Sequence, residues 1–431
     1  MNAKSINPII SVKLPYGKSF IELTLPKNNL LEVATIKPVR KVFNLRRAVA
    51  NALTKPIGLA DKNNFRDFLR ERRPKRIAVI VEDATRPNHK DYQDILEELL
   101  GALEQGGYFN DRVFLVIAYG THKKHKLTES QAIFGKKLMR SYRFHDHDCS
   151  SDNVLLGKMS TGTDLWVNEA IAHADYIIST GNIAPHTFAG FSGGRKGILP
   201  GVCGKDTIDA NHAKVCRPGV GMGMLENNPI HLEMEEAAEK VGLQFIVNVV
   251  RNDKKEVVQV VAGDWKEAFA VGVAKAREVY GYEFKHRSDV VIASSGGFPK
   301  DTSLYHAQLA FTAMSGIVNK NGTLVLVAEC ANGAGQKVFA KTMAGNTVDN
   351  ILLKKETEIP VGVHRAYLSA KILKDIECIL VSSMEKKVVE SMHFRYAKTI
   401  DDALSMVRKK HGDNYAAYVV PNGSYILPII K

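Results

Sequence analysis

Residues Arg76–Ala118 have the sequence RIAVIVEDATRPNHKDYQDILEELLGALEQGGYFNDRVFLVIA. The two ends of this stretch, Arg76–Val81 and Val113–Ala118, are short apolar runs rich in β-branched residues, which is typical of buried strands. Between them, apolar residues three and four positions apart predict a helix over Pro87–Gln105. Because a helix between two buried strands is the usual crossover of a parallel sheet, the stretch predicts an α/β fold.

The same alternation continues along the chain. Further strands are predicted at Tyr176–Ser179, Phe245–Val250, Val257–Val261, Val290–Ser294, Gly322–Ala328 and Cys378–Val381, and helices at Leu225–Val241, Trp265–Tyr280 and Ser303–Asn319. The pattern restarts after the charged stretch KHRSD, so we place a domain boundary near residue 286. We predict two α/β domains with mostly parallel sheets and a cleft between them. Residues 1–285 form the N-terminal cofactor-binding domain, and residues 286–414 form a C-terminal α/β domain.

The two ends of the chain have a different pattern. Short alternating runs at Ser11–Leu14 and Ser19–Leu25 predict a small antiparallel unit that covers a face or an edge of a sheet. The tail, residues 415–431, is predicted as strand, turn and strand, and it could return to the first domain.

Length and composition indicate a globular protein without membrane segments. A chain of 431 residues is too long for one ordinary core, and 45% apolar with 24% charged residues is typical of soluble domains. No apolar run approaches the roughly 18 to 20 residues of a spanning helix, and the N-terminus lacks the features of a signal peptide. We therefore expect a cytoplasmic protein with no membrane partner. The five cysteines include no Cys-x-x-Cys pair, which argues against a disulfide framework and a zinc ribbon.

The net charge of +13 has two interpretations, a nucleic-acid surface or an anionic small substrate. The densest basic stretch, Leu69–Arg76, contains a glutamate and lacks the interleaved aromatic residues of a single-strand binder. We favour the anionic substrate and expect no nucleic-acid partner. A basic nucleic-acid-binding protein is kept as an alternative.

The segment richest in candidate functional residues is TGNIAPHTFAGFSGGRKGILPGVCGKDTIDANHAKV, residues 180–215. It follows a predicted strand, so it lies at a carboxyl end, where open α/β sheets bind their ligands. Its glycines permit close backbone approach to an anion, and Lys196, His186 and His212 lie in or beside them. The sequence fails the Walker A pattern. A generic phosphate-binding turn, with Arg195 and Lys196 as counter-charges, stays open as an alternative.

Two more predicted strands end in polar residues. EDATRP, residues 82–87, supplies Asp83 and Arg86, and GTHKKH, residues 120–125, supplies His122. A parallel sheet brings such ends to one edge, so these side chains are expected near the glycine-rich segment. Two metal interpretations are weaker: a His-x-x-His pair of His122 and His125, and the FHDHDC stretch at 144–149, which we expect on a polar surface.

These segments, in this order, resemble the nickel-dependent lactate racemase family. The resemblance rests on EDATRP, GTHKKH, PHTFAGFSGGRKGILPGV followed by NH, and GGFPKD at 296–301, and it covers nearly the whole chain. It implies a pyridinium mononucleotide with thioamide and thiocarboxylate sulfurs, joined covalently to Lys196 and carrying nickel. It also implies that His212 is the protein ligand of the nickel, a role that suits an imidazole.

The resemblance further implies a racemase or epimerase of a 2-hydroxy carboxylate that works by reversible hydride transfer through a 2-keto acid. His122 and His186 match the catalytic histidines, and Asp83 and Arg86 match residues near cofactor and substrate. Cofactor-biosynthesis enzymes are implied partners. From glycine chemistry alone, the backbone amides of Ser192, Gly193 and Gly194 are further candidates to hold the cofactor phosphate.

One segment departs from the family pattern. In the lactate racemase family, the segment after the second Gly-Gly turn follows a Tyr-Gln-Ala-x-Lys pattern. At the matching positions this chain has Tyr305, His306, Ala307, Gln308 and Leu309. An amine is therefore missing from the expected carboxylate pocket unless Lys300 or His306 replaces it. The expected substrate-binding residues are Arg86, Tyr305, His306 and Lys300, and the substrate could be a longer, aromatic or sugar-derived 2-hydroxy acid.

Overall fold

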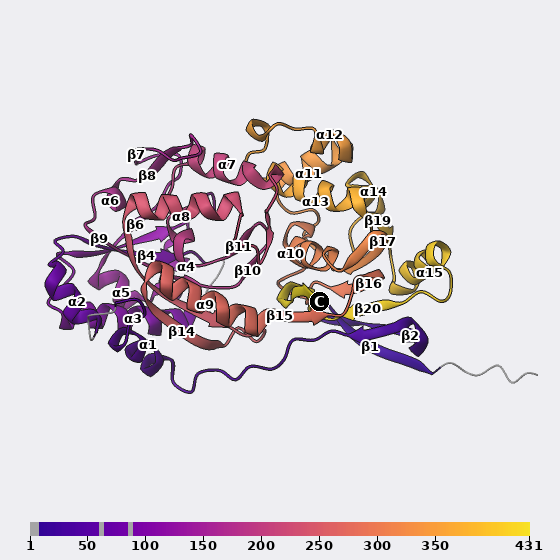
Figure 1. Cartoon of the computed structure of the whole chain (residues 1–431), viewed down its shortest axis with the longest axis horizontal. Coiled ribbons are helices and arrows are strands. Elements are labelled where there is room, and N and C mark those ends of the chain that lie inside the picture. The colour runs from indigo at the N-terminus through magenta and orange to yellow at the C-terminus, as the bar shows by residue number, and fades with distance from the viewer. Residues whose placement is uncertain (1–7, 60–63, 85–88) are drawn as a thin grey trace, which may run out of the picture. The chain divides into compact units, whose positions relative to one another are not determined.

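The computed structural model describes residues 8–59, 64–84 and 89–431. The chain folds into two compact units (Figure 1). The N-terminal unit is Pro38–Val279, and the C-terminal unit joins the segment ending at Lys37 to Tyr280–Lys431. Both are α/β units with mostly parallel sheets, as the alternation of strands and helices predicts.

The sheet of the N-terminal unit has, among the described residues, the strand order β14-β13-β9-β4-β5-β6. Its strands are β4 (Ile77–Glu82), β5 (Val113–Ala118), β6 (Arg143–Asp146), β9 (Tyr176–Asn182), β13 (Leu243–Arg251) and β14 (Val257–Asp264). All neighbours are parallel except β13 and β14, which are antiparallel. The chain runs from β4 to β5 and β6 on one side of β4, and it then crosses back to form β9 and β13 on the other side. The carboxyl ends of β4 and β9 therefore form a topological switch point.

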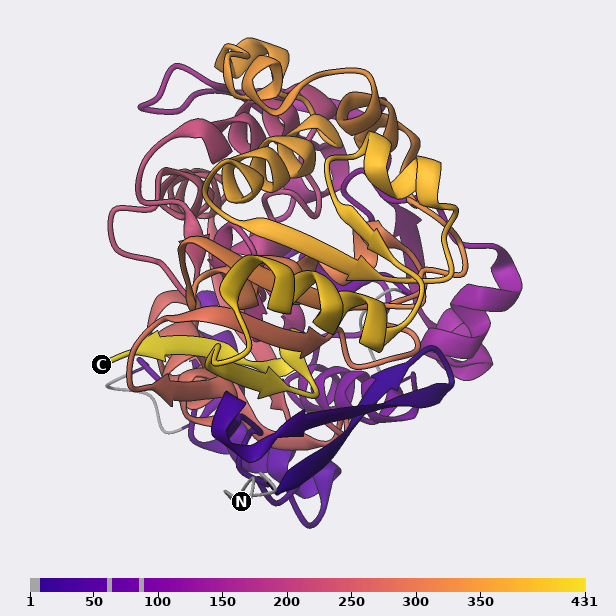
Figure 2. The ribbon, with the colours of Figure 1, turned by 90° about the vertical axis from the view of Figure 1, so that its right-hand side faces the viewer.

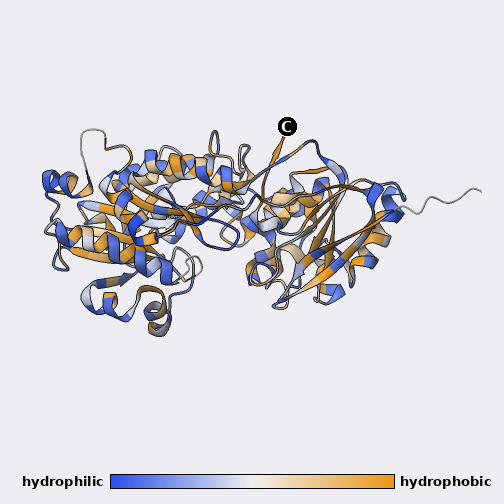
Figure 3. Cartoon of the chain, turned by 90° about the horizontal axis from the view of Figure 1, so that it is seen from below, coloured by the Kyte–Doolittle hydropathy of each residue, from blue (hydrophilic) through white to orange (hydrophobic). Residues whose placement is uncertain are grey.

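Helices cover both faces of this sheet. They are α1 (Leu45–Thr54), α2 (Phe65–Arg72), α3 (His89–Gln105), α4 (Leu127–Phe134), α5 (Lys136–Ser141), α6 (Glu169–Ala172), α7 (Lys205–Ala213), α8 (Pro229–Val241) and α9 (Trp265–Tyr280). The core on one face joins α1, α2 and α3 to alternate residues of the strands, such as Val79 and Leu115. Figure 3 shows the apolar colouring concentrated on the strands and the inner sides of helices.

Short elements connect the sheet to the glycine-rich segment. A hairpin of β7 (Asn153–Lys158) and β8 (Asp164–Asn168) precedes β9. The strands β10 (Pro185–His186), β11 (Ala189–Phe191) and β12 (Gly221–Met222) form a small sheet after β9. The glycine-rich segment thus continues directly from the switch point.

The C-terminal unit has its own sheet with the order β19-β18-β17-β16-β20-β3 in the described chain, and all its neighbours are parallel. Its strands are β3 (Leu30–Val33), β16 (Ser288–Ser294), β17 (Val318–Val327), β18 (Glu377–Val381), β19 (Arg395–Ala397) and β20 (Ala417–Val420), while β15 (Gly281–Phe284) pairs with β21 (Leu427–Ile430). Its helices are α10 (Leu304–Ser315), α11 (Lys337–Ala344), α12 (Val348–Leu352), α13 (Val363–Asp375), α14 (Lys386–Ser391) and α15 (Ile400–His411).

The N-terminal hairpin is a separate two-stranded sheet that packs on this second sheet. The strands β1 (Ile9–Tyr16) and β2 (Ser19–Pro26) are antiparallel, and they lie beside β16 with α15 above the strands (Figures 1 and 2). The buried side chains of Leu14, Leu23 and Leu25 pack in one core with α15 and the strands β16 to β20. The prediction of an antiparallel unit on a sheet face agrees with this hairpin.

The structure corrects the expected domain division of 1–285 and 286–414 at its ends. The segment ending at Lys37 joins the C-terminal unit, because its leucines and β3 complete that unit's core and sheet edge. The tail, residues 415–431, does not return to the first domain, since β20 pairs with β16 and β21 with β15. None of the described helices has the length and apolarity needed to cross a membrane.

The hairpin is predicted to contribute to the stability of the C-terminal unit. Leu14→Ala removes a fully buried side chain and should lower the free energy of unfolding by roughly 2–5 kcal/mol. Phe20→Ala, on the same hairpin but 65% exposed, is the matched control and should change it little. Urea unfolding of both variants measures the difference, and equal stabilities would contradict the assignment of the hairpin to this core.

Candidate active site

The loops after β4 and β5 bring Asp83 and His122 together. His122 Nδ1 lies 2.5 Å from Asp83 Oδ2, with the carboxylate 3% exposed and the imidazole 49% exposed. A buried carboxylate beside a ring nitrogen keeps the proton on Nδ1, so the lone pair of Nε2 faces outward. This is the arrangement of an oriented general base.

His125 has a structural role instead of the metal role considered for the His122–His125 pair. Its Nε2 accepts a hydrogen bond from the backbone N–H of Ala84 at 2.7 Å, and its ring stacks edge-on against Tyr119. His125 therefore fixes the loop that carries Asp83. The two imidazoles have different partners, and no cluster of three His, Cys, Asp or Glu side chains among the described residues includes them.

The glycine-rich segment gathers three candidate residues around one aromatic ring. The ring centroid of Phe188 lies 4.5 Å from that of His186 and 5.0 Å from that of His212. Lys196 Nζ lies 5.9 Å from the same centroid. We call these four residues the Phe188 cluster. An amine and two imidazoles thus occupy one small region beyond the end of β9, where the sequence predicted them.

Arg195, adjacent to Lys196, is fully buried. Its guanidinium donates hydrogen bonds to the carbonyl oxygens of Ala189, Phe191 and Gly193, at 2.7 to 3.2 Å, and to His231 Nδ1 at 2.9 Å. Burial lowers the pKa of Arg195 to about 9, so the group stays charged at neutral pH. The expected role of Arg195 as a counter-charge for a bound phosphate is wrong, because its donors are used to hold the loop itself.

Two of the three backbone amides expected to hold a phosphate also bind the protein. The N–H of Ser192 donates to Ala184 O at 2.8 Å, and the N–H of Gly194 donates to Asn248 Oδ1 at 2.7 Å. These two amides therefore hold the loop itself, which corrects the expectation that they bind a cofactor phosphate. The glycines serve close packing: a Cβ on Gly197 would lie 2.1 Å from Ser179 Oγ on β9.

His212 is positioned by a buried ionic network behind α7. The neighbouring Asn211 donates to Glu233 Oε2 at 2.8 Å, and Lys214 Nζ lies 2.9 Å from Glu233 Oε1. Burial of Glu233 opposes its charge, but hydrogen bonds from Thr161 and Asn211 and the charge of Lys214 hold its pKa below the ordinary value. The network locks α7 onto α8, so the His212 imidazole has a defined place beside Phe188.

The FHDHDC stretch contains a buried histidine, against the expectation of a polar surface. His147 is 1% exposed, and its Nε2 donates to the carbonyl of Cys203 at 3.0 Å. Cys203 follows the glycine-rich turn, so His147, which comes directly after β6, supports that turn. Burial lowers the pKa of His147 to about 4.

The expected substrate residues of the C-terminal unit lie near one another. His306 Nδ1 is 2.8 Å from Ser303 Oγ, and its ring lies edge-on to Tyr305 with centroids 6.3 Å apart. Lys300 Nζ lies 5.0 Å from the centroid of the Tyr425 ring. Arg365, which no motif marked, stacks on Tyr305 at 4.2 Å. The sequence alone could not mark Arg365, because α13 lies far from α10 along the chain.

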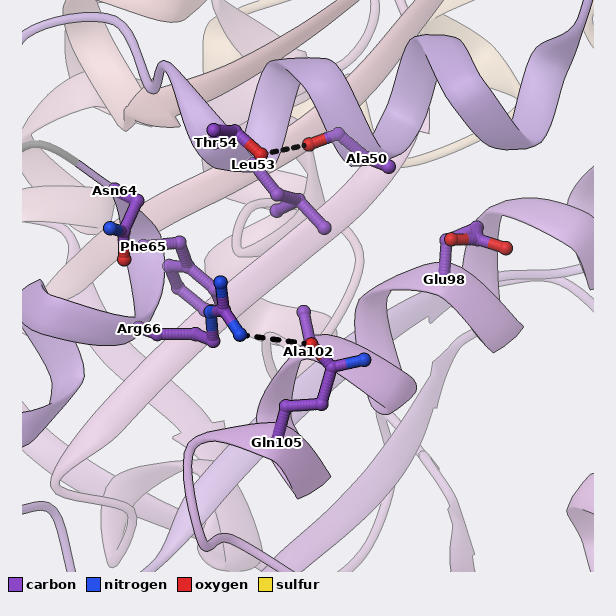
Figure 4. A pocket seen from close by; sticks show the side chains of 9 residues that line it. All are labelled: Ala50, Leu53, Thr54, Asn64, Phe65, Arg66, Glu98, Ala102 and Gln105. Atoms are coloured by element: carbon purple, nitrogen blue, oxygen red, sulfur yellow. Dashed lines mark hydrogen bonds between the residues drawn. The ribbon is translucent and has the colours of Figure 1, made fainter.

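The remaining candidate site residues and cavities are not part of the groups described above. Arg86 falls outside the described residues. Within the described ranges, no three His, Cys, Asp or Glu side chains gather as they would around a protein-only metal site. A pocket of about 110 Å³ on α1, α2 and α3 (Figure 4) is smaller than the roughly 300–1,000 Å³ of usual ligand pockets, and it contains none of the candidates. It is lined by Ala50, Leu53, Thr54, Asn64, Phe65, Arg66, Glu98, Ala102 and Gln105.

Comparison with known proteins agrees with this fold. The model of the lactate racemase N-terminal domain matches residues 16–223, and that of the lactate racemase C-terminal domain matches residues 284–427. A lactate racemase from Thermoanaerobacterium thermosaccharolyticum is 31% identical over 97% of this chain and 99% of its own length. One from Lactiplantibacillus plantarum is 29% identical over 96% of this chain and 99% of its own length.

The structural comparison leads to the same family. The solved structure of the lactate racemase apoprotein from Thermoanaerobacterium thermosaccharolyticum has a TM-score of 0.89 and 30% identity, and covers 98% of this chain and 100% of that one. The fold is that of a two-domain α/β isomerase. The chain belongs to the lactate racemase family, whose members are racemases.

His147 predicts a loss of stability in acid. The unfolded chain protonates this imidazole near pH 6.5 and the folded protein only near pH 4, so acidification between these values favours unfolding by roughly 1.4 kcal/mol per pH unit. His147→Gln keeps a donor for Cys203 and should flatten this dependence, whereas the exposed His173→Gln should not. Urea unfolding from pH 7 to pH 4 measures it, and identical slopes for all three proteins would exclude a buried neutral His147.

Proposed function

We propose that this enzyme inverts or epimerises the α-carbon of a 2-hydroxy carboxylate, using a nickel-bearing pyridinium mononucleotide joined to Lys196. The observation that carries the proposal is the Phe188 cluster, in which Lys196, His186 and His212 surround one ring. The loop after β5, which carries His122 and its bond to Asp83, is joined to the same glycine-rich segment by the hydrogen bond from Gly120 N–H to Gly201 O. Such a constellation at a switch point supports chemistry on a small ligand bound between the strand ends.

The residues of the cluster fit the proposed cofactor. Lys196 offers a primary amine for covalent attachment, and its backbone is fixed within η2 (Gly194–Gly197) by hydrogen bonds to Gly193 and Gly201. His212 offers an imidazole, which suits nickel alongside sulfur donors. The aromatic face of Phe188 provides an apolar surface for a flat ring between them. Held by Lys196 and His212, such a cofactor would supply a reversible hydride acceptor.

Under this proposal His122 handles the hydroxyl proton. Its Nε2 accepts the proton while its Nδ1–H stays with Asp83, whose carboxylate stabilises the imidazolium that forms. Loss of that proton, together with departure of the α-hydrogen and its bonding pair as hydride, leaves a planar 2-keto acid. Addition of the hydride to the other face and return of the proton give the opposite configuration, so atoms and charge balance.

Under this proposal His186 donates a hydrogen bond to the substrate, whereas His122 accepts a proton. The N–H of Ala189 donates to His186 Nδ1 at 3.3 Å, so a neutral His186 carries its proton on Nε2 and offers a donor to the substrate oxygen. His122 follows β5 and His186 lies in β10, just beyond β9, and these two strands flank β4. Under this proposal the two histidines serve the two enantiomers from different sides of the planar intermediate.

The proposed substrate is a 2-hydroxy carboxylate, and it is not restricted to lactate. The relatives are named lactate racemases, but His306 and Leu309 replace the Gln and Lys of the family pattern. Lys300, Tyr305 and His306 stay the proposed substrate contacts of the C-terminal unit, together with Arg86. Ser192 to Gly194 support the loop shape and thereby the position of Lys196.

The proposal is tested by producing the protein together with pincer-cofactor biosynthesis enzymes. A cofactor-sized mass on the Lys196 peptide and near-stoichiometric nickel are expected. Lys196→Ala should lose both the mass and the nickel, while His212→Ala should keep the mass and lose nickel. An unmodified Lys196 in protein from cells that modify a known family member would contradict the proposal and direct attention to phosphorylated ligands.

The loaded enzyme provides a second prediction. Asp83→Asn keeps the size of the side chain but removes the charge that stabilises protonated His122. It should lower kcat for racemisation by roughly 10²- to 10⁴-fold, with a smaller effect on KM. Asp148→Asn, at a partly exposed carboxylate that pairs with Lys124, serves as the control. Chiral chromatography of the product measures the rate, and an unchanged kcat in Asp83→Asn would remove His122 from the proposed role.

A further inference from the structure

The imidazole of His125 is joined to the loop of Asp83 by a backbone hydrogen bond and is packed between aromatic rings. Its Nε2 accepts the N–H of Ala84 at 2.7 Å. Its ring centroid lies 4.8 Å from that of Tyr119, edge-on, and 6.5 Å from that of Phe134, and both of these rings are buried. Because Ala84 directly follows Asp83, the position of His125 Nε2 sets the path of the chain beside that carboxylate.

The bond to Ala84 also defines the tautomer of His125. A ring nitrogen that accepts an amide N–H carries no proton, so the neutral imidazole has its proton on Nδ1. The hydroxyl oxygen of Ser130, a buried residue of α4, lies 3.4 Å from Nδ1 and can accept from it. The other tautomer would set two N–H donors against each other at Ala84. Ser130 therefore favours the tautomer that binds the loop of Asp83.

The backbone of His125 is fixed by a second group of hydrogen bonds. Burial raises the pKa of Tyr119, so its hydroxyl stays protonated and donates to Asp146 Oδ1 at 2.9 Å. The same hydroxyl oxygen accepts the N–H of His125 at 3.2 Å. Since Asp146 is the last residue of β6, these bonds tie the loop after β5 to the neighbouring strand. His125 is thus a fixed point that holds the loop after β4.

The hydrogen bond between His122 and Asp83 depends on the relative position of these two loops. His122 belongs to the same loop as His125, and its backbone N–H donates to Tyr119 O at 2.8 Å. Asp83 belongs to the loop after β4, and only 2.5 Å separate its Oδ2 from His122 Nδ1. A displacement of Ala84 away from His125 would lengthen this bond. Groups that transfer protons lose rate when they are misplaced by as little as about 1 Å.

We propose that His125 is a positioning residue for racemisation, which holds Asp83 against His122 through Ala84, and that Ser130 selects the tautomer in which it does so. The inference rests on the proposed function for the role of His122 as general base. It assigns neither a ligand nor a proton transfer to His125 itself. The rate of the bound substrate should therefore depend on His125, whereas substrate binding should not.

Two substitutions separate the acceptor of His125 from its packing. His125→Phe keeps a flat ring beside Tyr119 but removes the acceptor, so kcat of the cofactor-loaded chain should fall roughly 10- to 100-fold with little change in KM. His125→Gln gives up the ring but places an amide oxygen near the position of Nε2, so it should restore most of kcat. His145→Phe is the matched control at a partly buried histidine that lies edge-on to Phe114, and it should keep the wild-type kcat.

Nuclear magnetic resonance of the whole chain gives a readout that does not depend on turnover. The nitrogen shifts should show the proton of His125 on Nδ1, and the Nδ1 proton of His122 should appear far downfield, because it lies in a short bond to a carboxylate. This downfield signal, assigned by its absence in His122→Gln, should be lost in His125→Phe and kept in His125→Gln and His145→Phe. Thermal unfolding checks that each variant is folded. If His125→Phe unfolds, Ser130→Ala, which should shift His125 toward the other tautomer, carries the test.

The outcomes separate this inference from the proposed function. A folded His125→Phe that keeps either the wild-type kcat or the downfield signal of His122 would overturn the role of His125 while the racemase proposal stands. Equal losses of kcat in His125→Phe and His125→Gln would overturn it too, because packing and not the acceptor would then matter. Loss of the His122 signal in His125→Phe, in a protein that racemises no 2-hydroxy acid, would support His125 and count against the proposed function. A wild-type His125 with its proton on Nε2 would overturn the inference, whatever the activity.

Discussion

The buried guanidinium of Arg195 shapes the part of the structure on which the proposed chemistry depends. A charge inside the protein is costly unless it is hydrogen-bonded, and Arg195 donates four hydrogen bonds to loop carbonyls and His231. The face of Phe269, 4.5 Å from the guanidinium carbon, adds a cation–π contact. These bonds bend the glycine-rich loop around one point, so the next residue, Lys196, is turned toward Phe188.

A second buried ionic group completes the same region. Glu233, paired with Lys214 and bonded to Asn211, fastens α7 and with it His212. Buried pairs of this kind add little net stability but penalise every arrangement that separates them. Arg195 and Glu233 therefore define one geometry for the amine and the imidazole. An attached cofactor would need such a preorganised pair, because loose ligands would lose much of the binding energy to ordering.

Much of the fold was predictable, since buried parallel strands are continuous β-branched runs. Val113–Ala118 agrees with β5 to the residue, and Trp265–Tyr280 agrees with α9. The strand β3 was not predicted, because LLEV gains its stability from pairing with β20 at the far end of the chain.

The site was predicted in part for similar reasons. The strand-end rule brought Asp83 and His122 to one edge, where they form a hydrogen bond. Sequence could not distinguish the adjacent cations Arg195 and Lys196, because which of them faces inward depends on carbonyls and on Phe269. Nor could it mark Arg365, whose partner Tyr305 lies on another helix.

The central claim is that the α-hydrogen of the substrate leaves and returns as a hydride held by the enzyme, while only the hydroxyl proton meets His122. Racemisation of a 2-hydroxy acid deuterated at its α-carbon, in ordinary water, tests this directly. The account predicts that the inverted product retains the deuterium and that the reaction slows with the heavier isotope. Product in which the deuterium has been replaced by solvent hydrogen would contradict it and would indicate proton abstraction at carbon.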